Sequence, residues 1–311
     1  MRFLWQRLAR IAYNRVMTPA VHSIDSRLVL TCPDFSNRKS GEDVLSTWRI
    51  ARLREDRLIR EWPTGDPRVT LLAYYFWADD ADGAHLDALE CAMLEAWRHC
   101  GQMRTVIVAD RMNERLEALV SRQVGVIEVQ IEPTLEPGNL YTMSVDCNSR
   151  LHRRFATDYV MIVQDDGFPI RPGLGEYIGK FDFIGAPYVR NRWHLQAVCR
   201  LLKCQVCNGG FSLRSRRICE LAAHYWEKKY HRMPVCDHVS EDYFYTKTLP
   251  IREPAYRRQI TMPSFADAND FAYDAVFPYV GSRPPFGFHT ALAFKLLHAA
   301  GVVETSEEAR E

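Results

Sequence analysis

Two adjacent acids follow a short apolar run in YVMIVQDDGFPI, residues 159–170. Asp165 and Asp166 precede Gly167, whose missing side chain lets a ligand approach the backbone. A divalent cation binds one or two protein carboxylates and completes its coordination with waters and the phosphate oxygens of a substrate. The stretch therefore predicts a strand that ends at a cation site, and a solvated turn is the simpler alternative.

A second polar group lies in CNGGFSLRS, residues 207–215. Two consecutive glycines, Gly209 and Gly210, indicate a backbone that turns tightly or is closely approached before a short strand. Asn208 and Ser212 could hydrogen-bond a polar ligand such as a sugar. A plain hairpin turn is the alternative.

An acidic pair and a histidine complete the candidates. Glu241 and Asp242 follow Ser240, so they either cap a helix or supply a general base that removes a proton from an acceptor hydroxyl. His289 lies in PFGFHT, where a neutral imidazole could bind a metal or serve a structural role. Each of these motifs is weak by itself.

The elements that must position these residues alternate between strands and helices. Strands are expected at 69–76, 105–110, 125–131, 159–163 and 181–189, and helices at 86–100, 113–121 and 142–156. This alternation predicts a parallel sheet with helices on both faces. Ligands bind beyond the carboxyl ends of such strands, so Asp110, at the end of the second strand, should face the same crevice as Asp165 and Asp166.

The flanking segments differ in character. Residues 1–67 are charged and helix-rich, 250–287 are rich in prolines, aromatics and turns, and the tail is acidic. Residues 1–17 combine arginines with one apolar helical face, so a helix there could lie on an anionic membrane surface or pack on the protein itself. No apolar run approaches the ~20 residues that span a bilayer.

Composition excludes few classes of protein. The formal net charge of +1 over 311 residues gives no case for a nucleic-acid partner. Nine cysteines without a secretory signal favour a reduced, cytoplasmic setting. Cys204 and Cys207 have metal-binding spacing but lack a second such pair, so buried thiols are the simpler interpretation.

Taken in order, QDDG, FDFIGAPY, NGGFSLRSRR, EDYF and FGFH resemble the motif series of a bacterial family of largely uncharacterised, predicted glycosyltransferases. The resemblance covers roughly Val69 to His289. It implies an α/β, GT-A-like, Rossmann-type nucleotide-sugar-binding fold with a mixed, mainly parallel central sheet. The chain then divides into a helical N-terminal extension (1–67), a glycosyltransferase domain (68–292) and an acidic, disordered tail (293–311).

The resemblance also implies metal ligands. The family's strand-end motif reads Gln, usually Trp, then Asp-Gly, so Asp166 is the expected ligand and Asp165 replaces the aromatic residue. His289 matches a second ligand, although the family's motif continues with glycine where this chain has Thr290. The residues expected around the metal and the nucleotide are Asp110, Gln164, Asp165 and Gly167.

The remaining matches concern the acceptor. The loop expected to line the junction of donor and acceptor consists of Asn208, Gly209, Gly210 and Phe211. Glu241 and Asp242 match the acidic pair from which GT-A enzymes draw a base. If one base activates the acceptor and no covalent intermediate forms, the anomeric configuration inverts.

The expected activity is transfer from a nucleotide-sugar donor to a hydroxyl of a glycan or lipid-linked glycan, dependent on Mn²⁺ or Mg²⁺. The expected setting is bacterial surface-polysaccharide synthesis in the cytoplasm, with residues 1–17 placing the protein peripherally on the inner membrane face. Two alternatives stay open. Clustered acids also serve metal-dependent phosphohydrolases and nucleases, and the same fold could form a noncatalytic sugar-binding module.

Overall fold

The computed structural model describes residues 21–24, 27–30, 41–56, 61–76, 83–123, 125–136, 139–188, 206–232, 240–276 and 279–303. The proposed membrane-binding segment 1–17, Cys204 and the last residues of the acidic tail lie outside these ranges. Among the helices that are described, none is both long and apolar enough to cross a membrane.

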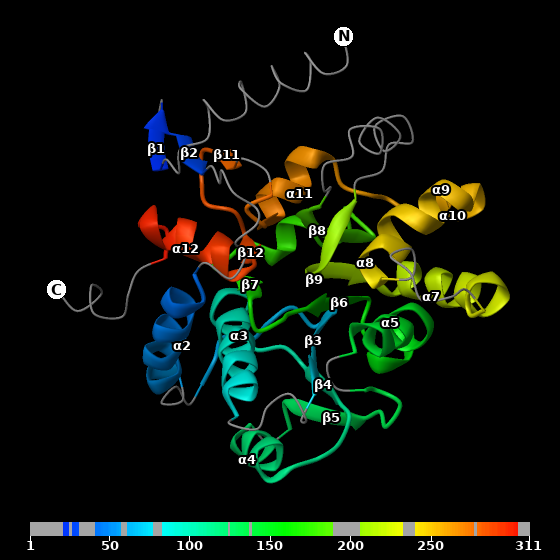
Figure 1. The fold of residues 1–311 in the computed structure, drawn as a ribbon, viewed down its shortest axis with the longest axis horizontal. Coiled ribbons are helices and arrows are strands. Elements are labelled where there is room, and N and C mark those ends of the chain that lie inside the picture. Colours follow the sequence, from blue (N-terminus) through cyan, green and yellow to red (C-terminus); the bar gives the residue numbers. More distant parts are fainter. Residues whose placement is uncertain are drawn as a thin grey trace, which may run out of the picture.

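A six-stranded sheet forms the centre of the molecule, in the order β5-β4-β3-β6-β9-β8 (Figure 1). Strands β5, β4, β3 and β6 run parallel, and β9 is antiparallel to both of its neighbours. The predicted α/β fold with a mixed, mainly parallel sheet is confirmed. The strands are β3 (Val69–Tyr75), β4 (Thr105–Ala109), β5 (Ile127–Ile131), β6 (Tyr159–Ile162), β8 (Phe183–Pro187) and β9 (Cys207–Ser215).

Helices cover both faces of this sheet. Neighbouring side chains of a strand point to opposite faces, so Leu71 of β3 joins a core with α3 and α4, whereas Leu72 joins a core with α5 and α7. Burial on both faces explains why β3 is apolar throughout. These helices are α3 (Ala84–Cys100), α4 (Glu114–Arg122), α5 (Leu140–Arg154) and α7 (Arg216–Tyr225).

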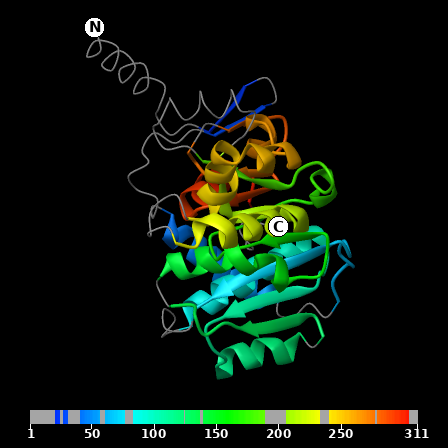
Figure 2. The same ribbon diagram turned by 90° about the vertical axis from the view of Figure 1, so that its right-hand side faces the viewer.

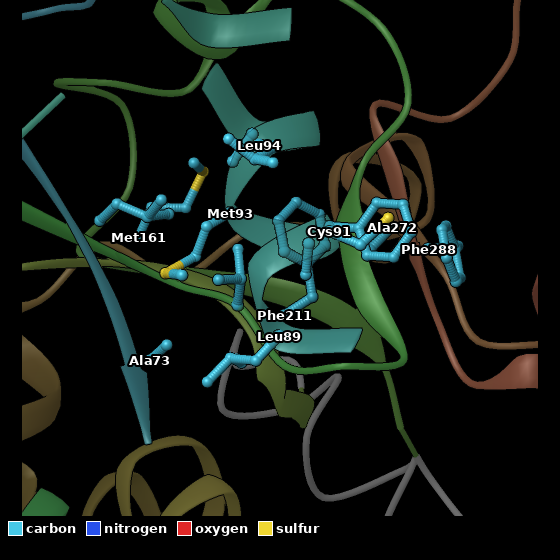
Figure 3. Close-up of a cluster of buried hydrophobic side chains, with 14 of the residues drawn as sticks. Ala73, Leu89, Cys91, Met93, Leu94, Met161, Phe211, Ala272 and Phe288 are labelled. Carbon is cyan, nitrogen blue, oxygen red and sulfur yellow. The ribbon is translucent and has the colours of Figure 1, made fainter. Parts of the chain in front are cut away.

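Figure 3 shows part of the first core, where Met93 and Leu94 of α3 lie near Met161 of β6. Phe211 of β9 and Phe288 belong to the same core, which therefore reaches from the central sheet into the C-terminal region. The core thus fixes the relative positions of segments that are far apart in the sequence.

Two small sheets accompany the central sheet. In Figure 1, β1, β2 and β11 lie above it, and β7 and β12 lie beside β9. Figure 2 gives a second view of the same fold. One has the order β10-β12-β7, with β7 (Gly167–Pro169), β10 (Ala272–Tyr273) and β12 (Gly287–His289). The other has the order β1-β2-β11, with β1 (Val21–Ile24), β2 (Arg27–Leu30) and β11 (Tyr279–Gly281). Strands β1 and β2 lie in the segment that was expected to be helical, and they were not predicted.

Helix α2 (Glu42–Asp56) also lies in that N-terminal segment, and it packs against α3 and α12 (Ala291–Ala299). Trp48 of α2 stacks on Phe168 of β7 with ring centroids 5.8 Å apart, and its ring lies 5.1 Å from that of Phe294. The division of the chain into three segments stays a prediction, although α2 is in contact with the predicted domain. The expected disorder over 293–311 is wrong for residues 293–299, which belong to α12 and bury Phe294 and Leu297.

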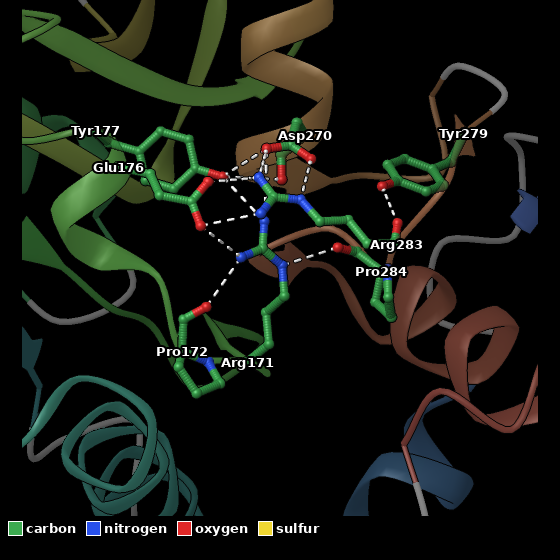
Figure 4. A network of polar contacts seen from close by, with 8 residues as sticks. All are labelled: Arg171, Pro172, Glu176, Tyr177, Asp270, Tyr279, Arg283 and Pro284. Carbon is green, nitrogen blue, oxygen red and sulfur yellow. Dashed lines mark hydrogen bonds and ion pairs between the residues drawn. The ribbon is translucent and has the colours of Figure 1, made fainter. Parts of the chain in front are cut away.

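The segment from Pro250 to Gly287 was expected to be irregular, but it contains short helices and strands. Arg283 ties it to the segment after β7, because its guanidinium contacts Glu176 at 2.5 Å and Asp270 at 2.8 Å (Figure 4). Arg171 joins the same network. The remaining helical elements are η3 (Leu174–Glu176), π-helical η4 (Trp226–Tyr230) and η5 (Phe244–Thr248), α8 (Glu241–Tyr243), α9 (Leu249–Arg252), α10 (Pro254–Gln259) and α11 (Phe265–Phe271).

Candidate active site

The candidate site lies at the carboxyl end of β6, where the order of the strands reverses. From β3 the chain continues to β4 and β5 on one side, and then returns to form β6 on the other side. In open α/β sheets ligands bind outside the carboxyl ends of the strands at such a reversal. The predicted strand-end acids therefore lie where the topology favours a ligand.

A tight turn over residues 164–167 presents these acids. The backbones of Gln164 and Gly167 exchange two hydrogen bonds of 3.1 Å, and β7 begins at Gly167. Asp165 and Asp166 occupy the two central positions of the turn, and both are partly exposed. Arg49 of α2 donates from Nη2 to the carbonyl oxygen of Asp165.

His289 reaches this turn because β12 pairs with β7, which places His289 opposite Gly167. Its Nε2 lies 3.2 Å from Gln164 Oε1 and 3.6 Å from Asp166 Oδ1. Its Nδ1 lies 3.4 Å from Asp274 Oδ1. The structure therefore brings together the two residues that were expected to bind a metal.

The donor atoms fit a hard divalent cation. If Nδ1–H of His289 donates to Asp274, Nε2 directs a lone pair toward the oxygen atoms of Gln164 and Asp166. A carboxylate on the second ring nitrogen is the usual support of a metal-binding histidine. Within the described ranges no three His, Cys, Asp or Glu side chains form a metal-binding group. A cation here would complete its shell with waters or phosphate oxygens, as Mg²⁺ does.

The electrostatic environment of Asp166 also suits a cation. Burial raises the pKa of Asp166, and the neighbouring Asp165 and Asp274 raise it further, while His289 and Arg49 oppose this. A bound cation would have the opposite effect, because it favours the ionised carboxylate.

A bulge in β9 forms the opposite wall of the site. Gly185 of β8 pairs with Ser212 and Pro187 pairs with Cys207, so β8 advances by two residues while β9 advances by five. Asn208 stabilises the bulge, since its Oδ1 accepts from the Gly210 N–H at 2.8 Å. The glycines were expected in a turn before the strand, but they lie within the strand, where β8 pairs on both sides of them.

The two glycines of the bulge allow close approach from two directions. A Cβ on Gly210 would lie 2.3 Å from both Gln164 Oε1 and His289 Nε2. A Cβ on Gly209 would lie 2.2 Å from Glu241 Oε1. A side chain at either position would displace these groups. Little more than the backbone of the bulge therefore separates His289 and Asp166 from Glu241 and Asp242.

Arg214 stabilises the bulge through hydrogen bonds. Its side chain is fully buried, and Nη2 donates to the carbonyl of Gly209 and to Glu241 Oε2, both at 3.1 Å. Its Nε donates to Ser212 Oγ at 3.1 Å. Arg214 thereby fixes the carboxylate of Glu241 against the bulge.

The acidic pair begins α8, as predicted, but its two members differ. Glu241 is buried and paired with Arg214, and burial raises its pKa to about 6. Asp242 is partly exposed, and its Oδ1 accepts from Ser240 Oγ and from the Tyr243 N–H. Burial raises the pKa of Asp242 as well. Asp242 is therefore the member of the pair that a ligand could reach.

Two of the expected site residues lie apart from this group. Asp110 follows β4, two strands away from β6, and it accepts from Arg111 Nε at 3.0 Å. Phe211 is fully buried and stacks on Phe271 with centroids 5.0 Å apart. Its side chain belongs to the core, so only its backbone lies at the bulge.

Three residues of the site were not predicted. Arg214 lies in the quoted NGGFSLRS motif, where a charged residue within the expected strand was the available signal. Asp274 and Arg49 lie in segments that were expected to be a turn-rich stretch and a helical extension. Their contacts with His289 and Asp165 join residues far apart in the sequence, and no local pattern indicates them.

Residues 141–289, slightly less than half of the chain, match the model of a protein family of unknown function (DUF5672). The match includes the turn, the bulge, the acidic pair and His289, and it excludes α2. No curated protein matches the chain in sequence.

Among solved structures, the chain is similar to the apo-form glycosyltransferase GlyE of Streptococcus pneumoniae TIGR4, with 9% identity, 78% of this chain and 62% of that chain covered, and a TM-score of 0.44. The mannosyltransferase Ktr4p of S. cerevisiae is 8% identical, with 73% of this chain and 77% of that chain covered and a TM-score of 0.40. The mannosyltransferase PcManGT of Pyrobaculum calidifontis, in complex with GDP-Man and Mn²⁺, is 12% identical, with 59% of this chain and 56% of that chain covered and a TM-score of 0.29. The chain spans less than two thirds of the length of GlyE and of PcManGT.

Proposed function

We propose that the protein is a divalent-metal-dependent glycosyltransferase that moves a sugar from a nucleotide-sugar donor to a hydroxyl group. One observation carries the proposal. The bulge of β9 has the Asp166–His289 pair on one side and the Glu241–Asp242 pair on the other. A donor diphosphate and an acceptor hydroxyl need these two kinds of group at one junction.

The donor side would be formed by the turn and by β12. Asp166 and His289 would hold Mn²⁺ or Mg²⁺, with Gln164 beside them and Asp274 orienting the imidazole. Such a cation stabilises the negative charge that grows on a departing diphosphate. Asp165 contributes its carbonyl oxygen to Arg49 and its charge to the field around Asp166.

The acceptor side would use Asp242 as the general base. Its partly exposed carboxylate can take the proton of a hydroxyl group, and its raised pKa makes it a stronger base than a free aspartate. Glu241 would position the bulge through Arg214. A single base and no covalent intermediate give inversion at the anomeric carbon.

The biological setting is proposed from the motif series and the basic segment 1–17 alone. A glycan or lipid-linked glycan would be the acceptor, in bacterial surface-polysaccharide synthesis on the cytoplasmic face of the membrane. Asn208, Gly209 and Gly210 would lie at the junction of donor and acceptor, and Asp110 would face the nucleotide.

The proposal is tested by a panel of sugar nucleotides in a thermal-shift assay with and without Mn²⁺, because a bound ligand stabilises the fold by mass action. Transfer with the donor so identified is then compared among variants. We expect Asp166→Ala to abolish transfer and to weaken Mn²⁺-dependent nucleotide binding. We expect Asp242→Asn to lower kcat by about 10²–10⁴-fold, the usual contribution of a general base, with donor binding retained.

Asp158→Ala is the matched control, because this exposed aspartate precedes the other end of β6 and should leave activity unchanged. Full transfer by Asp166→Ala would refute the site. Release of sugar phosphate without an acceptor would instead support a phosphohydrolase. Nucleotide binding without turnover, together with an indifferent Glu241 and Asp242, would support a sugar-binding module.

A further inference from the structure

Arg49 is a partly buried cation beside the strand-end acids. Its Nη2 donates to the Asp165 carbonyl, and its buried Nε has no hydrogen-bond partner among the residues that the structure describes. A guanidinium has five N–H donors. Since Arg49 donates to one backbone carbonyl, most of its N–H groups make no hydrogen bond to the residues that the structure describes.

Nearby arginines in the same region are paired with acids. Arg52 donates to Glu95 at 2.8 Å, and Arg98 contacts both Glu95 and Asp56. Arg49 makes no ion pair within 4 Å with any described carboxylate. The charge of Arg49 favours ionisation of Asp166 but makes no direct ion pair with it, so the guanidinium can still bind an anion that arrives with a ligand.

The position of Arg49 is well defined because the adjacent Trp48 anchors α2. Trp48 stacks on Phe168, which directly follows the acidic turn, at an interplanar angle of 14°. Leu45 and Leu53 are buried on the same helix. Arg49 is thus held at the turn before any ligand binds, which reduces the entropy lost on binding.

We propose that Arg49 binds phosphate oxygens of the donor diphosphate at the turn that carries Asp166. This inference rests on the proposed function and deepens it. The planar fork of a guanidinium matches two phosphate oxygens, and its charge opposes the charge of the diphosphate. Arg49 lies outside residues 141–289, so the N-terminal helix would complete a site that the matched segment forms only in part.

The test uses the full chain and inorganic pyrophosphate with Mn²⁺ as the probe, measured by isothermal titration calorimetry. Arg49→Gln should weaken pyrophosphate binding by about 10- to 100-fold, as expected for lost charge-assisted hydrogen bonds. Arg49→Lys should retain part of the affinity, because it keeps the charge but loses the fork. The control is Arg54→Gln, which removes an exposed arginine of the same helix and should change nothing.

Titration of Mn²⁺ alone separates ligand binding from support of the turn. We expect wild type and Arg49→Gln to bind Mn²⁺ equally. Equal pyrophosphate affinity in these two proteins would overturn the inference, as would a wild type that does not bind pyrophosphate or a variant that loses Mn²⁺ as well. If wild type binds pyrophosphate through Arg49 but transfers no sugar from any donor, the role of Arg49 stands and the proposed function fails.

Discussion

His289 connects three segments of the chain through one ring. Its Nδ1 faces Asp274, and its Nε2 faces Gln164 and Asp166. Asp274 is almost fully buried, and the low local dielectric strengthens the hydrogen bond between its carboxylate and the imidazole ring. By fixing which nitrogen carries the proton, Asp274 would determine whether Nε2 can bind a cation.

Replacement of Asp274 by Asn should therefore weaken Mn²⁺ binding without removing a ligand. We expect a loss of about 10- to 100-fold, the usual effect of removing the group that supports a metal-binding histidine. Calorimetric titration with Mn²⁺ measures it.

A double-mutant cycle with His289→Ala provides the control. The second substitution should add little to the first, because both act through the same ring. Fully additive losses, or unchanged Mn²⁺ affinity in Asp274→Asn, would show that Asp274 serves only the fold.

Thr290 is one residue at which the chain departs from the motif of the family that it resembles. Its φ of 91° is a backbone conformation that favours glycine, the residue found there in the family that the chain resembles. In return, Thr290 Oγ1 caps α12 by accepting from Ala293 N–H, and Thr290 N–H donates to the Asp166 carbonyl at 2.7 Å. The threonine thus couples the start of α12 to the acidic turn.

At the scale of elements, α2 is the piece whose attachment matters most to the site. Its indole, Trp48, lies between Phe168 of β7 and Phe294 of α12. A second attachment is polar, since Arg52 and Asp56 of α2 pair with Glu95 and Arg98 of α3. Both attachments hold Arg49 beside the acidic turn.

Trp48→Ala should destabilise the protein by roughly 3–5 kcal/mol, the usual cost of removing a buried aromatic ring. It should also weaken pyrophosphate binding, because α2 loses its anchor next to Arg49. Urea unfolding and calorimetry measure the two effects.

The neighbouring Ile50→Ala is the matched control, because Ile50 is 55% exposed and its loss should shift stability by no more than about 0.5 kcal/mol. Equal urea midpoints for Trp48→Ala and wild type would show that α2 is not anchored in this way.

The sequence predicted the alternating elements from residue 69 to 163 well, because each is long enough to show its own period. For example, the helix expected at 142–156 is observed as α5, two residues earlier at both ends. The strands of the two small sheets are two to four residues long, and partners far along the chain stabilise them, so they leave no periodic signal. Tertiary pairing rather than local propensity defines them.

The same limit applies to the site. Asp166 could be predicted because it lies shortly after an apolar strand, and Glu241 because it begins a helix. The sequence could not show that Gly209 and Gly210 form a bulge, because a bulge is defined by the pairing of β8 on both sides of them. Asp274 and Arg49 become recognisable only when the fold places them beside His289 and Asp165.

At the scale of the whole molecule, the free energy of unfolding depends on pH in opposite directions through two carboxylates, Glu132 and Glu241. Burial opposes ionisation of Glu132, but hydrogen bonds from Thr134, Arg154 and Arg150 outweigh it and lower its pKa to about 2. Glu132 therefore stabilises the fold above pH 4.5, its ordinary value, and this is lost as the pH falls toward 2. Burial raises the pKa of Glu241 to about 6, so the fold loses stability as the pH rises from 4.5 to about 6.

Together these two groups favour the folded state most near pH 4.5. From the size of the pKa changes, Glu132 should contribute a loss of roughly 3 kcal/mol toward pH 2, and Glu241 a loss of roughly 2 kcal/mol toward pH 7. Urea midpoints from pH 3 to 8 for wild type, Glu132→Gln and Glu241→Gln measure these losses.

Glu132→Gln should reduce the acid loss, where Glu95 also contributes, and Glu241→Gln should reduce the loss toward neutral pH, where Asp56 also contributes. If the Glu241→Gln curve keeps the slope of wild type between pH 4.5 and 6, Glu241 is not the group that titrates there.

The small β10-β12-β7 sheet has a consequence for biosynthesis. His289 meets Gln164 across 125 positions of the chain, and β12 is the middle strand that joins β7 to β10. A ribosome that adds about 5–20 residues per second reaches His289 roughly 6–25 seconds after Gln164. A nascent chain thus contains its acidic turn and its glycine bulge well before it contains the imidazole, and the candidate metal site can form only after β12 has been synthesised.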